Sequence, residues 1–380
     1  MSKQSWIPCS LLLAAGCAFS PNPDKRNPAL GDVAPLLSAA AIEVVAELPA
    51  PPGNLAVAAD GTVFFTFHPE AAPEVHLARV TAEGYALFPD EGWQREREDA
   101  PFFVTPLALR IDGRGWLWVL DHGDYGSETP SLTAFDCATG ELRHRFEFPS
   151  DVAGWGSMLN DFVVDSARDL IYIADPSPFE FDPALIVYDV GQRRARRLLE
   201  NHDSVLAEDL HTVVQGRFMK AFGLTLQIDV DSIALSGDGE QLIYGPLSGG
   251  TLYRVPTAAL RDLALDEEAL AAQVVVHGPK PITDGIVADG AGNVYLTAIE
   301  HDALAVSGPD GELSLLVQDP ELIAWPDGVC LGPQDAYLYA TCSELHHVIG
   351  EDLEGLPDHA PFRIVRVPLT ERSSPADGRR

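Results

Sequence analysis

Alternating apolar and polar positions form a unit that recurs six times along the chain. Most copies open with an Asn or Asp, continue with a short apolar run and an Asp/Gly turn, and end in an aromatic-rich strand. The copies begin at Gly53, Thr105, Leu159, Val230, Thr283 and Pro326, about 45–70 residues apart. Apolar alternation on both sides of an Asp-Gly turn predicts a strand, a tight turn and a second strand in every copy.

Further strand-like segments follow the hairpins, for example residues 185–190 and 251–255. Four strands in each of six units predict an all-β fold, a six-bladed β-propeller with four antiparallel strands per blade. A doubly wound α/β fold is excluded because it needs helices between parallel strands, where this chain has hairpins.

The two ends of the repeat region predict how the ring closes. Residues 42–48 form a strand pattern before the first copy, and residues 362–368 form another after the last. We expect one blade to take strands from both ends, within a propeller domain of residues 32–372 that is followed by a disordered tail, 373–380. Short helices are expected between blades at 258–273 and 203–212.

The N-terminus reads as an address. Residues 1–17 resemble a bacterial lipoprotein signal in which Cys17 is lipidated; the alternative is an ordinary cleaved secretory signal. Residues 18–31, rich in Pro and Asn, are expected to be a flexible tether. Both alternatives place the protein outside the cytoplasm, as a secreted, periplasmic or outer-membrane lipoprotein.

The composition narrows the partners. With 25 Lys and Arg against 57 Asp and Glu, the net charge is −32. Such a chain repels phosphate backbones, which excludes nucleic acid, and would meet a membrane only through the N-terminal lipid. The charge favours cations and a monomer. Cys330 falls opposite Tyr339 in the last predicted hairpin, so a disulfide with Cys342 is not expected.

The residues that open the inner strands form the candidate site. They would converge at one mouth of the central channel and are Asn54, Asn160, Asp231, Asp284 and Asp327. The second copy has Thr105 and Pro106 at this place. Carboxylate and amide oxygens suit a hard cation such as Ca²⁺. The same residues also cap turns or contact an organic ligand, and these alternatives stay open.

Two tryptophans and three histidines lie close to these positions. Trp155 and Trp325 precede Asn160 and Asp327, and each is expected either in the pocket or in blade packing. An acidic channel with aromatic walls suits a cationic amine. His122 is a candidate for the same face, whereas the pair His346-His347 is expected at the surface, with the channel rim as the alternative. No HExxH or GxSxG motif is present.

Several segments together carry a family resemblance. They are GNLAV (53–57), LWVLDHG (117–123), LNDFVVD with IYIAD (159–175), IALSGDGEQLIYGPLSGGTLYRV (233–255), GPKPITDGIVADGAGNVYLT (278–297) and AWPDGV (324–329). In their order and spacing the chain resembles a bacterial member of the major royal jelly protein / Yellow family, which is similar to the regucalcin and gluconolactonase propellers. The resemblance implies a secreted six-bladed propeller, with insect relatives that include salivary amine binders.

The resemblance to gluconolactonases also implies a metal site. In that group one Glu, two Asn and an Asp at the inner-strand starts hold a divalent ion. Carried over, this assigns Asn160, Asp231 and Asp284 as ligands of Ca²⁺ or another divalent cation, with Asn54 standing where the group has Glu.

Three functions follow from these patterns. The favoured one is a secreted or lipid-anchored propeller that binds a small cationic or aromatic ligand through Asn54, Asn160, Asp231, Asp284, Asp327, Trp155 and Trp325. The first alternative is a divalent-metal-dependent lactone hydrolase with Asp284 as the base. The second is an extracellular protein-interaction module. Asn54 in place of Glu favours binding, because an amide supplies no charge and cannot act as a base.

Overall fold

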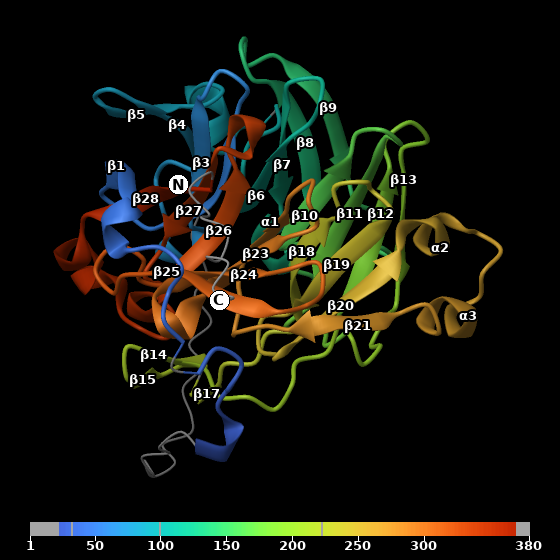
Figure 1. Cartoon of the computed structure of the whole chain (residues 1–380). Helices are drawn as coiled ribbons and strands as arrows, with labels where there is room; N and C mark the ends of the chain where they lie inside the picture. Colours follow the sequence, from blue (N-terminus) through green and yellow to red (C-terminus); the bar gives the residue numbers. More distant parts are fainter. Residues whose placement is uncertain (1–22, 32, 99, 222, 370–380) are drawn as a thin grey trace.

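The computed structural model describes residues 23–31, 33–98, 100–221 and 223–369 (Figure 1). The expected signal segment with Cys17, and the tail 373–380, lie outside the described residues. Among the described residues, no helix is both long and apolar enough to cross a membrane.

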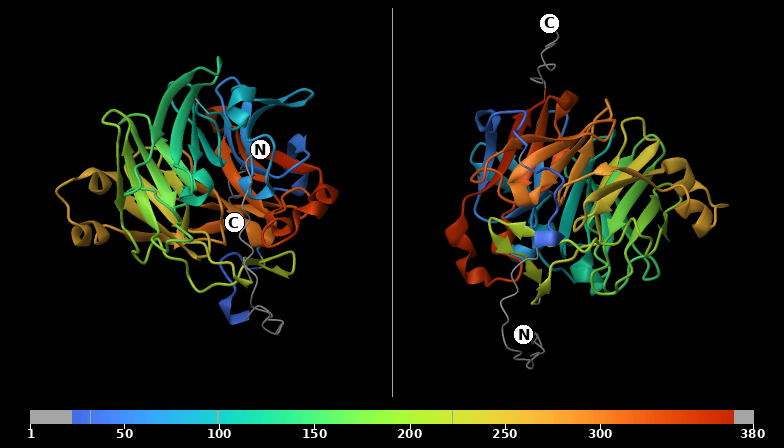
Figure 2. Two further views of the ribbon diagram at one scale, coloured as in Figure 1. Left: turned by 180° about the vertical axis from the view of Figure 1, so that it is seen from behind. Right: turned by 60° about the horizontal axis from the view of Figure 1, so that its bottom comes forward.

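Six four-stranded antiparallel sheets stand around a common centre (Figures 1 and 2). From the innermost strand outward, the blades are β2 (Pro52–Val57), β3 (Val63–Phe67), β4 (Leu77–Thr81) and β5 (Gly84–Leu87); β6 (Pro106–Ile111), β7 (Trp116–Asp121), β8 (Ser131–Asp136) and β9 (Leu142–Glu147); β10 (Asp161–Asp165), β11 (Leu170–Asp175), β12 (Ala184–Asp189) and β13 (Arg194–Leu198); β18 (Val230–Leu235), β19 (Gln241–Pro246), β20 (Thr251–Pro256) and β21 (Val275–Pro279); β22 (Ile286–Ala288), β23 (Val294–Ala298), β24 (Ala303–Ser307) and β25 (Leu313–Gln318); and β26 (Pro326–Leu331), β27 (Tyr337–Cys342), β28 (Phe362–Pro368) and β1 (Glu43–Leu48). The inner strands β2, β6, β10, β18, β22 and β26 contact one another in this order and return to β2. The predicted six-bladed propeller is confirmed.

The last blade joins the two ends of the chain. β1 pairs antiparallel with β28, and an ion pair of 2.6 Å between Glu43 and Arg366 reinforces this pairing. This is the closure that the terminal strand patterns predict. It leaves no inner or middle strand edge unpaired at the seam, which protects the ring from edge-to-edge association.

Aspartates hold the turns between the first and second strands. The Asp60 carboxylate accepts the Thr62 N–H at 2.9 Å, and the Asp238 carboxylate accepts the Glu240 N–H at 3.0 Å. These Asx turns are the local reason why the Asp-Gly pattern produces hairpins. In the last hairpin Cys330 pairs with Tyr339 as predicted, and Cys330 and Cys342 are both free.

The core lies between neighbouring blades. Trp118 of β7 is fully buried in a cluster with Phe162 and Ile173 of the next blade, and Trp116 packs against the same cluster. The second strands are buried on both faces because each sheet packs against two others. β3 therefore reads as an unbroken run of buried residues.

Two segments between blades differ in how well they were predicted. The expected helices near 258–273 are present as α2 (Thr257–Arg261) and α3 (Glu267–Ala271). The helix expected at 203–212 was wrong, because this segment forms turns. It leads into two small hairpins that no periodicity indicated, β14 (Val213–Val214) with β15 (Arg217–Phe218), and β16 (Lys220–Ala221) with β17 (Leu224–Thr225).

The segment before the first blade is packed and is no loose tether over residues 23–31. Arg26 forms an ion pair of 3.0 Å with the buried Glu300, and Lys25 pairs with Asp209 at 2.5 Å. The Asn27 side chain donates to the Lys280 carbonyl at 2.9 Å. The expectation of a flexible tether was therefore wrong for this part, because polar anchors on the fourth and fifth blades hold it.

Candidate functional site: a carboxylate ring in the propeller channel

The candidate residues lie at the end of the channel where the inner strands begin. In β2, β18 and β26 the pairing register shifts at this end, between Pro52 and Leu55, Val230 and Ser232, and Pro326 and Val329. Such a bulge takes a residue out of the ladder and redirects its side chain. Asn54, Asp231 and Asp327 lie within these shifts, so the recurring polar residue and the bulge are one feature.

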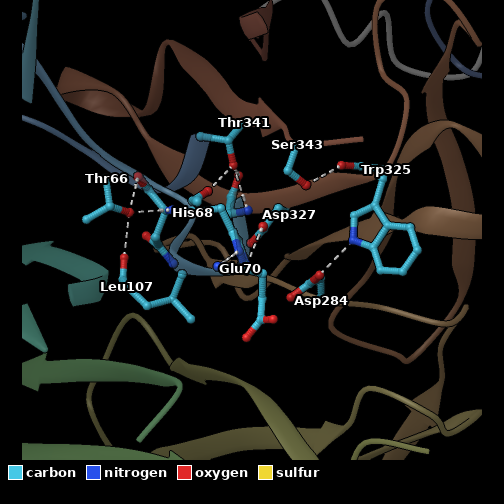
Figure 3. A network of polar contacts seen from close by, with 12 residues as sticks. Thr66, His68, Glu70, Leu107, Asp284, Trp325, Asp327, Thr341 and Ser343 are labelled. Carbon is cyan, nitrogen blue, oxygen red and sulfur yellow. Dashed lines mark hydrogen bonds and ion pairs between the residues drawn. The ribbon is translucent and has the colours of Figure 1, made fainter. Parts of the chain in front are cut away.

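Threonines on the second strands hold the bulges in place. Thr66 Oγ1 accepts the Asn54 N–H at 3.0 Å and donates to the Leu107 carbonyl of the next blade at 2.7 Å. Thr341 does the same between Gly328 and Gly53 across the closing seam (Figure 3). Each hydroxyl thus ties one bulged strand to the following blade and sets the spacing of the ring.

Three carboxylates from consecutive blades meet at this mouth. Asp231 and Asp327 are only 4% and 6% exposed. Burial raises the pKa of both well above the usual range, and the charge of Asp284 raises them further. Burial also raises the pKa of Asp284 to about 6, against the opposing hydrogen bond from Trp325. Desolvation and mutual repulsion both disfavour the ionised forms, so the site as it stands has excess negative charge.

The polar partners of these carboxylates do not saturate them. The Asn160 side chain donates to Asp231, yet Asp231 Oδ1 has no partner among the described residues. Ser343 contributes a hydrogen bond to Asp327, whose Oδ2 also lacks one. His68 Nε2 lies 3.7 Å from that Oδ2 (Figure 3). Burial and the neighbouring His122 lower the pKa of His68 to about 3, so its neutral ring does not balance the charge.

Lys280 is a buried cation in this region that the sequence analysis did not single out. Its Nζ donates to the carbonyls of Leu247, Gly249 and Pro281 at 3.3, 2.7 and 3.2 Å. Burial lowers its pKa to about 7, while Glu208, Asp231 and Asp284 oppose the change. The carbonyl cage satisfies the ammonium group, so Lys280 offsets the carboxylates only through space. A lone Lys between two prolines in this acidic chain was the available signal.

Asn54 is held by a second residue that the sequence analysis missed. Asn54 Oδ1 accepts from Arg110 Nη1 at 2.9 Å and from the Leu55 N–H at 2.8 Å. Arg110 Nη2 pairs with the buried Asp161 at 2.7 Å. The Asn54 oxygen is therefore already occupied by a guanidinium group. Asp161 directly follows Asn160, so the LND sequence was the only local signal for this pair.

The second blade lacks an Asn or Asp and contributes a histidine. The Thr105 hydroxyl lies 3.3 Å from His122 Nδ1, which also accepts the Tyr125 N–H at 3.1 Å. His122 is buried, and its Nε2 has no partner among the described residues. The placement of His122 on this face is confirmed, since the loop after β7 lies at the end where the inner strands begin.

The two candidate tryptophans have different surroundings. Trp325 is 1% exposed, and its Nε1 donates to Asp284 Oδ2 at 3.0 Å (Figure 3). Trp155, in the loop before β10, is 66% exposed, and Phe181 in the loop between β11 and β12 is also exposed. Both loops lie at the mouth end, and the Gly156 N–H bonds the Tyr125 carbonyl at 2.8 Å. We name the exposed Trp155, Phe179 and Phe181 the aromatic rim.

Replacing Trp325 with Phe tests the tie to Asp284. The change keeps most of the buried ring but removes the only indole donor at this carboxylate. Because hydrogen bonds to charged groups contribute about 1.5–3 kcal/mol, we expect the free energy of unfolding at pH 8 to fall by roughly that amount. Denaturant unfolding at pH 8 and pH 5 measures it. Since the indole favours ionised Asp284, an equal loss at both pH values would contradict this role.

Taken together, the described residues define a propeller with an anionic channel site. The structure brings Asp231, Asp284 and Asp327 into mutual electrostatic contact and joins Asn160 to Asp231. It places Asn54 with Arg110, Trp325 against Asp284, and Trp155 at the rim.

The comparison with known proteins gives the family. The family model described as Major royal jelly protein matches residues 104–375, and the chain belongs to this family. It is similar to major royal jelly protein 2 of Apis mellifera, with 30% identity over 187 residues, which cover 46% of this chain and 39% of that protein. The matched part is therefore less than half of the relative's own length.

Solved structures show the same fold. A gluconolactonase from Xanthomonas campestris superimposes with a TM-score of 0.53 and 15% identity, over 90% of this chain and 91% of that one. A luciferin-regenerating enzyme gives a TM-score of 0.54 and 11% identity, over 86% and 94% of the two chains. At these identities the likeness establishes the fold alone.

Proposed function

We propose that this protein binds a small organic cation in the channel, with its charged group among Asp231, Asp284 and Asp327. The observation that carries the proposal is the pair of buried oxygens without partners, Asp231 Oδ1 and Asp327 Oδ2. Buried carboxylates that repel one another are costly unless a positive charge joins them. A bound cation would remove that cost, so the ring stores a preference for positive ligands.

The aromatic rim supports an organic ligand over a bare ion. Trp155 and Phe181 expose large apolar surfaces at the same end as the carboxylates. Exposed aromatic groups beside a polar floor are typical of sites for ligands that have one charged and one apolar end. An arylalkylamine has this shape: the ammonium group would enter the channel, and the ring would stay near the rim. We further propose that the protein acts as a monomer outside the cytoplasm, secreted or anchored through Cys17.

The experiment compares a charged and a neutral probe of equal size on the full-length protein. Calorimetric titration with phenethylamine should give one site per chain, and phenethyl alcohol should bind at least about 100-fold more weakly, which corresponds to about 2.7 kcal/mol. Equal affinity for the two probes would contradict the proposal, because the carboxylates would then contribute nothing.

The affinity for phenethylamine should depend on pH in a defined direction. The ligand binds the ionised carboxylates, and the raised pKa values, about 6 for Asp284, mean that protons must leave first. The affinity should therefore be weakest at pH 5 and rise up to pH 8, with release of protons on binding. Calorimetry in two buffers of different ionisation enthalpy measures that release. A dissociation constant that is flat over this range would contradict the assignment.

A second candidate function is divalent-metal-dependent hydrolysis of a lactone. The two free carboxylate oxygens, with the Asn160 amide beside Asp231, are a donor set that fits a hard cation. Such an ion would polarise a carbonyl when bound. Asp284, with its pKa at about 6, is ionised at neutral pH and would act as the base. The occupied Asn54 oxygen is the observation against it.

The two candidates separate in one assay. Thermal melts of the full-length protein in EDTA, then with Ca²⁺, Mg²⁺ or Mn²⁺ added, should be run beside hydrolysis of glucono-δ-lactone. A stabilising ion together with metal-dependent turnover would favour the hydrolase. Stabilisation by the amine without turnover would favour binding.

A further inference from the structure

A second cluster of chemical interest lies outside the channel ring, in the loop after β27. Glu344 has a left-handed backbone with φ of 49°, and a single 3₁₀ turn, Leu345–His347, follows it. This geometry folds the chain back so that the ligand atoms of Glu344, His346 and His347 all lie within 4.8 Å of one another. Glu344 Oε2 and His347 Nε2 are 3.9 Å apart.

His346 is the unusual member. The expectation of a surface pair was wrong for this residue, since it is only 2% exposed. Neither of its ring nitrogens has a hydrogen-bond partner among the described residues. Buried polar groups are almost always paired, so two orphan nitrogens on one ring need an explanation. A bound ion would satisfy one of them.

The protonation states also suit a metal. Burial, with His347 next in effect, lowers the pKa of His346 to about 3, and burial lowers the pKa of His347 as well. Both imidazoles are therefore neutral at pH 7, which is the form that binds metals. Burial raises the pKa of Glu344 to about 7, against Arg363, so this carboxyl also gains from a nearby cation.

We propose that Glu344, His346 and His347 form a binding site for a borderline transition-metal ion such as Zn²⁺. Two imidazoles and one carboxylate are a known zinc donor set that leaves a fourth position for water. Nitrogen donors favour Zn²⁺, Ni²⁺ or Cu²⁺ over Ca²⁺ and Mg²⁺. Zinc bonds of about 2.0–2.2 Å require the ligand atoms to draw closer, and the partly exposed His347 side chain has room to turn.

The surroundings connect this site to the channel. The Trp325 ring lies parallel to His346, at 6.4 Å between centroids and 12° between planes, while its Nε1 bonds Asp284. Arg217, whose charge acts on both histidines, is paired with Glu351. The exposed His359 stacks on His347 at 3.7 Å but is no member of the donor group. An ion here would fix the loop against the ring that orients Asp284.

The test uses full-length protein that has been treated with EDTA and then saturated with Ca²⁺, which would fill any hard-cation site in the channel. Calorimetric titration with Zn²⁺ should show one site per chain. Co²⁺ should give the visible absorption of a site with nitrogen ligands, and Zn²⁺ should displace it. No binding of Zn²⁺ or Co²⁺ under these conditions would overturn the proposal.

Variants separate the site from adventitious binding. Glu344→Gln and His347→Ala should each weaken Zn²⁺ binding by at least about 10–100-fold, the loss that even outer-sphere changes cause at metal sites. His359→Ala removes a neighbouring surface imidazole and should leave the affinity unchanged. Asp327→Asn should also leave it unchanged, so this result does not depend on the channel proposal. Equal Zn²⁺ affinity in Glu344→Gln, His347→Ala and the wild type would overturn the site.

Discussion

Replacing Asp231 with Asn is expected to stabilise the ligand-free protein at pH 8 and to leave its stability at pH 4 nearly unchanged. Asp231 is a buried carboxylate with one oxygen unpaired and Asp284 nearby. Removing an uncompensated buried group of this kind should raise the free energy of unfolding by about 1–3 kcal/mol.

The direction with pH follows from the raised pKa of Asp231. The folded state holds the proton more tightly than the unfolded state, so stability is present below the unfolded pKa of about 3.9 and is lost as pH rises through the folded value. The gain in the Asn variant should therefore appear between pH 4 and pH 8. Denaturant unfolding across this range measures it.

A matched control is Asp60→Asn at the opposite end of the blades. Hydrogen bonds with Thr62 lower the pKa of Asp60, so its contribution runs the other way and is lost as pH falls. Destabilisation of the Asp231→Asn variant at pH 8 would show that the carboxylate is satisfied in the folded protein, and would remove the basis of the cation site.

The largest loss of stability is expected from Arg110→Met. Arg110 joins Asn54 of the first blade to the buried Asp161 of the third. Burial already raises the pKa of Asp161 although Arg110 opposes it. Breaking one partner of a buried ion pair typically costs about 3–5 kcal/mol, because the other charge is left unpaired. Denaturant unfolding at pH 7 measures the loss.

Two further variants make the Arg110 result specific. The double variant Arg110→Met/Asp161→Asn should recover much of the loss, since no buried charge remains. Arg143→Met breaks only the exposed pair with Asp136 and should cost at most about 1 kcal/mol. If Arg110→Met proved no worse than Arg143→Met, the pair would not hold the inner strands together.

The fold was predictable because each local signal agreed with the global one. Asp60 and Asp238 cap their turns, β1 meets β28 at the seam, and Cys330 faces Tyr339, all as the alternation and the turns indicate. The small hairpins between β13 and β18 were not predictable, since two-residue strands leave no periodicity.

The candidate site was predictable only in part, for a physical reason. Asp231 and Asp327 recur at one repeat position, and the bulge at that position aims them into the channel. Arg110 and Lys280 occupy positions that do not recur, so their approach to the ring depends on the packing of neighbouring blades. The burial of His346 likewise depends on how its loop packs against Trp325, which a pair of adjacent histidines does not indicate.

The measurement that tests the central claim most directly is a titration of phenethylamine at pH 8 into the wild type, Asp60→Asn, and the double variant Asp231→Asn/Asp327→Asn. The wild type and the Asp60 variant should bind one ligand with equal affinity, and the double variant should show no binding. Wild-type affinity in the double variant would contradict a cation site in the channel.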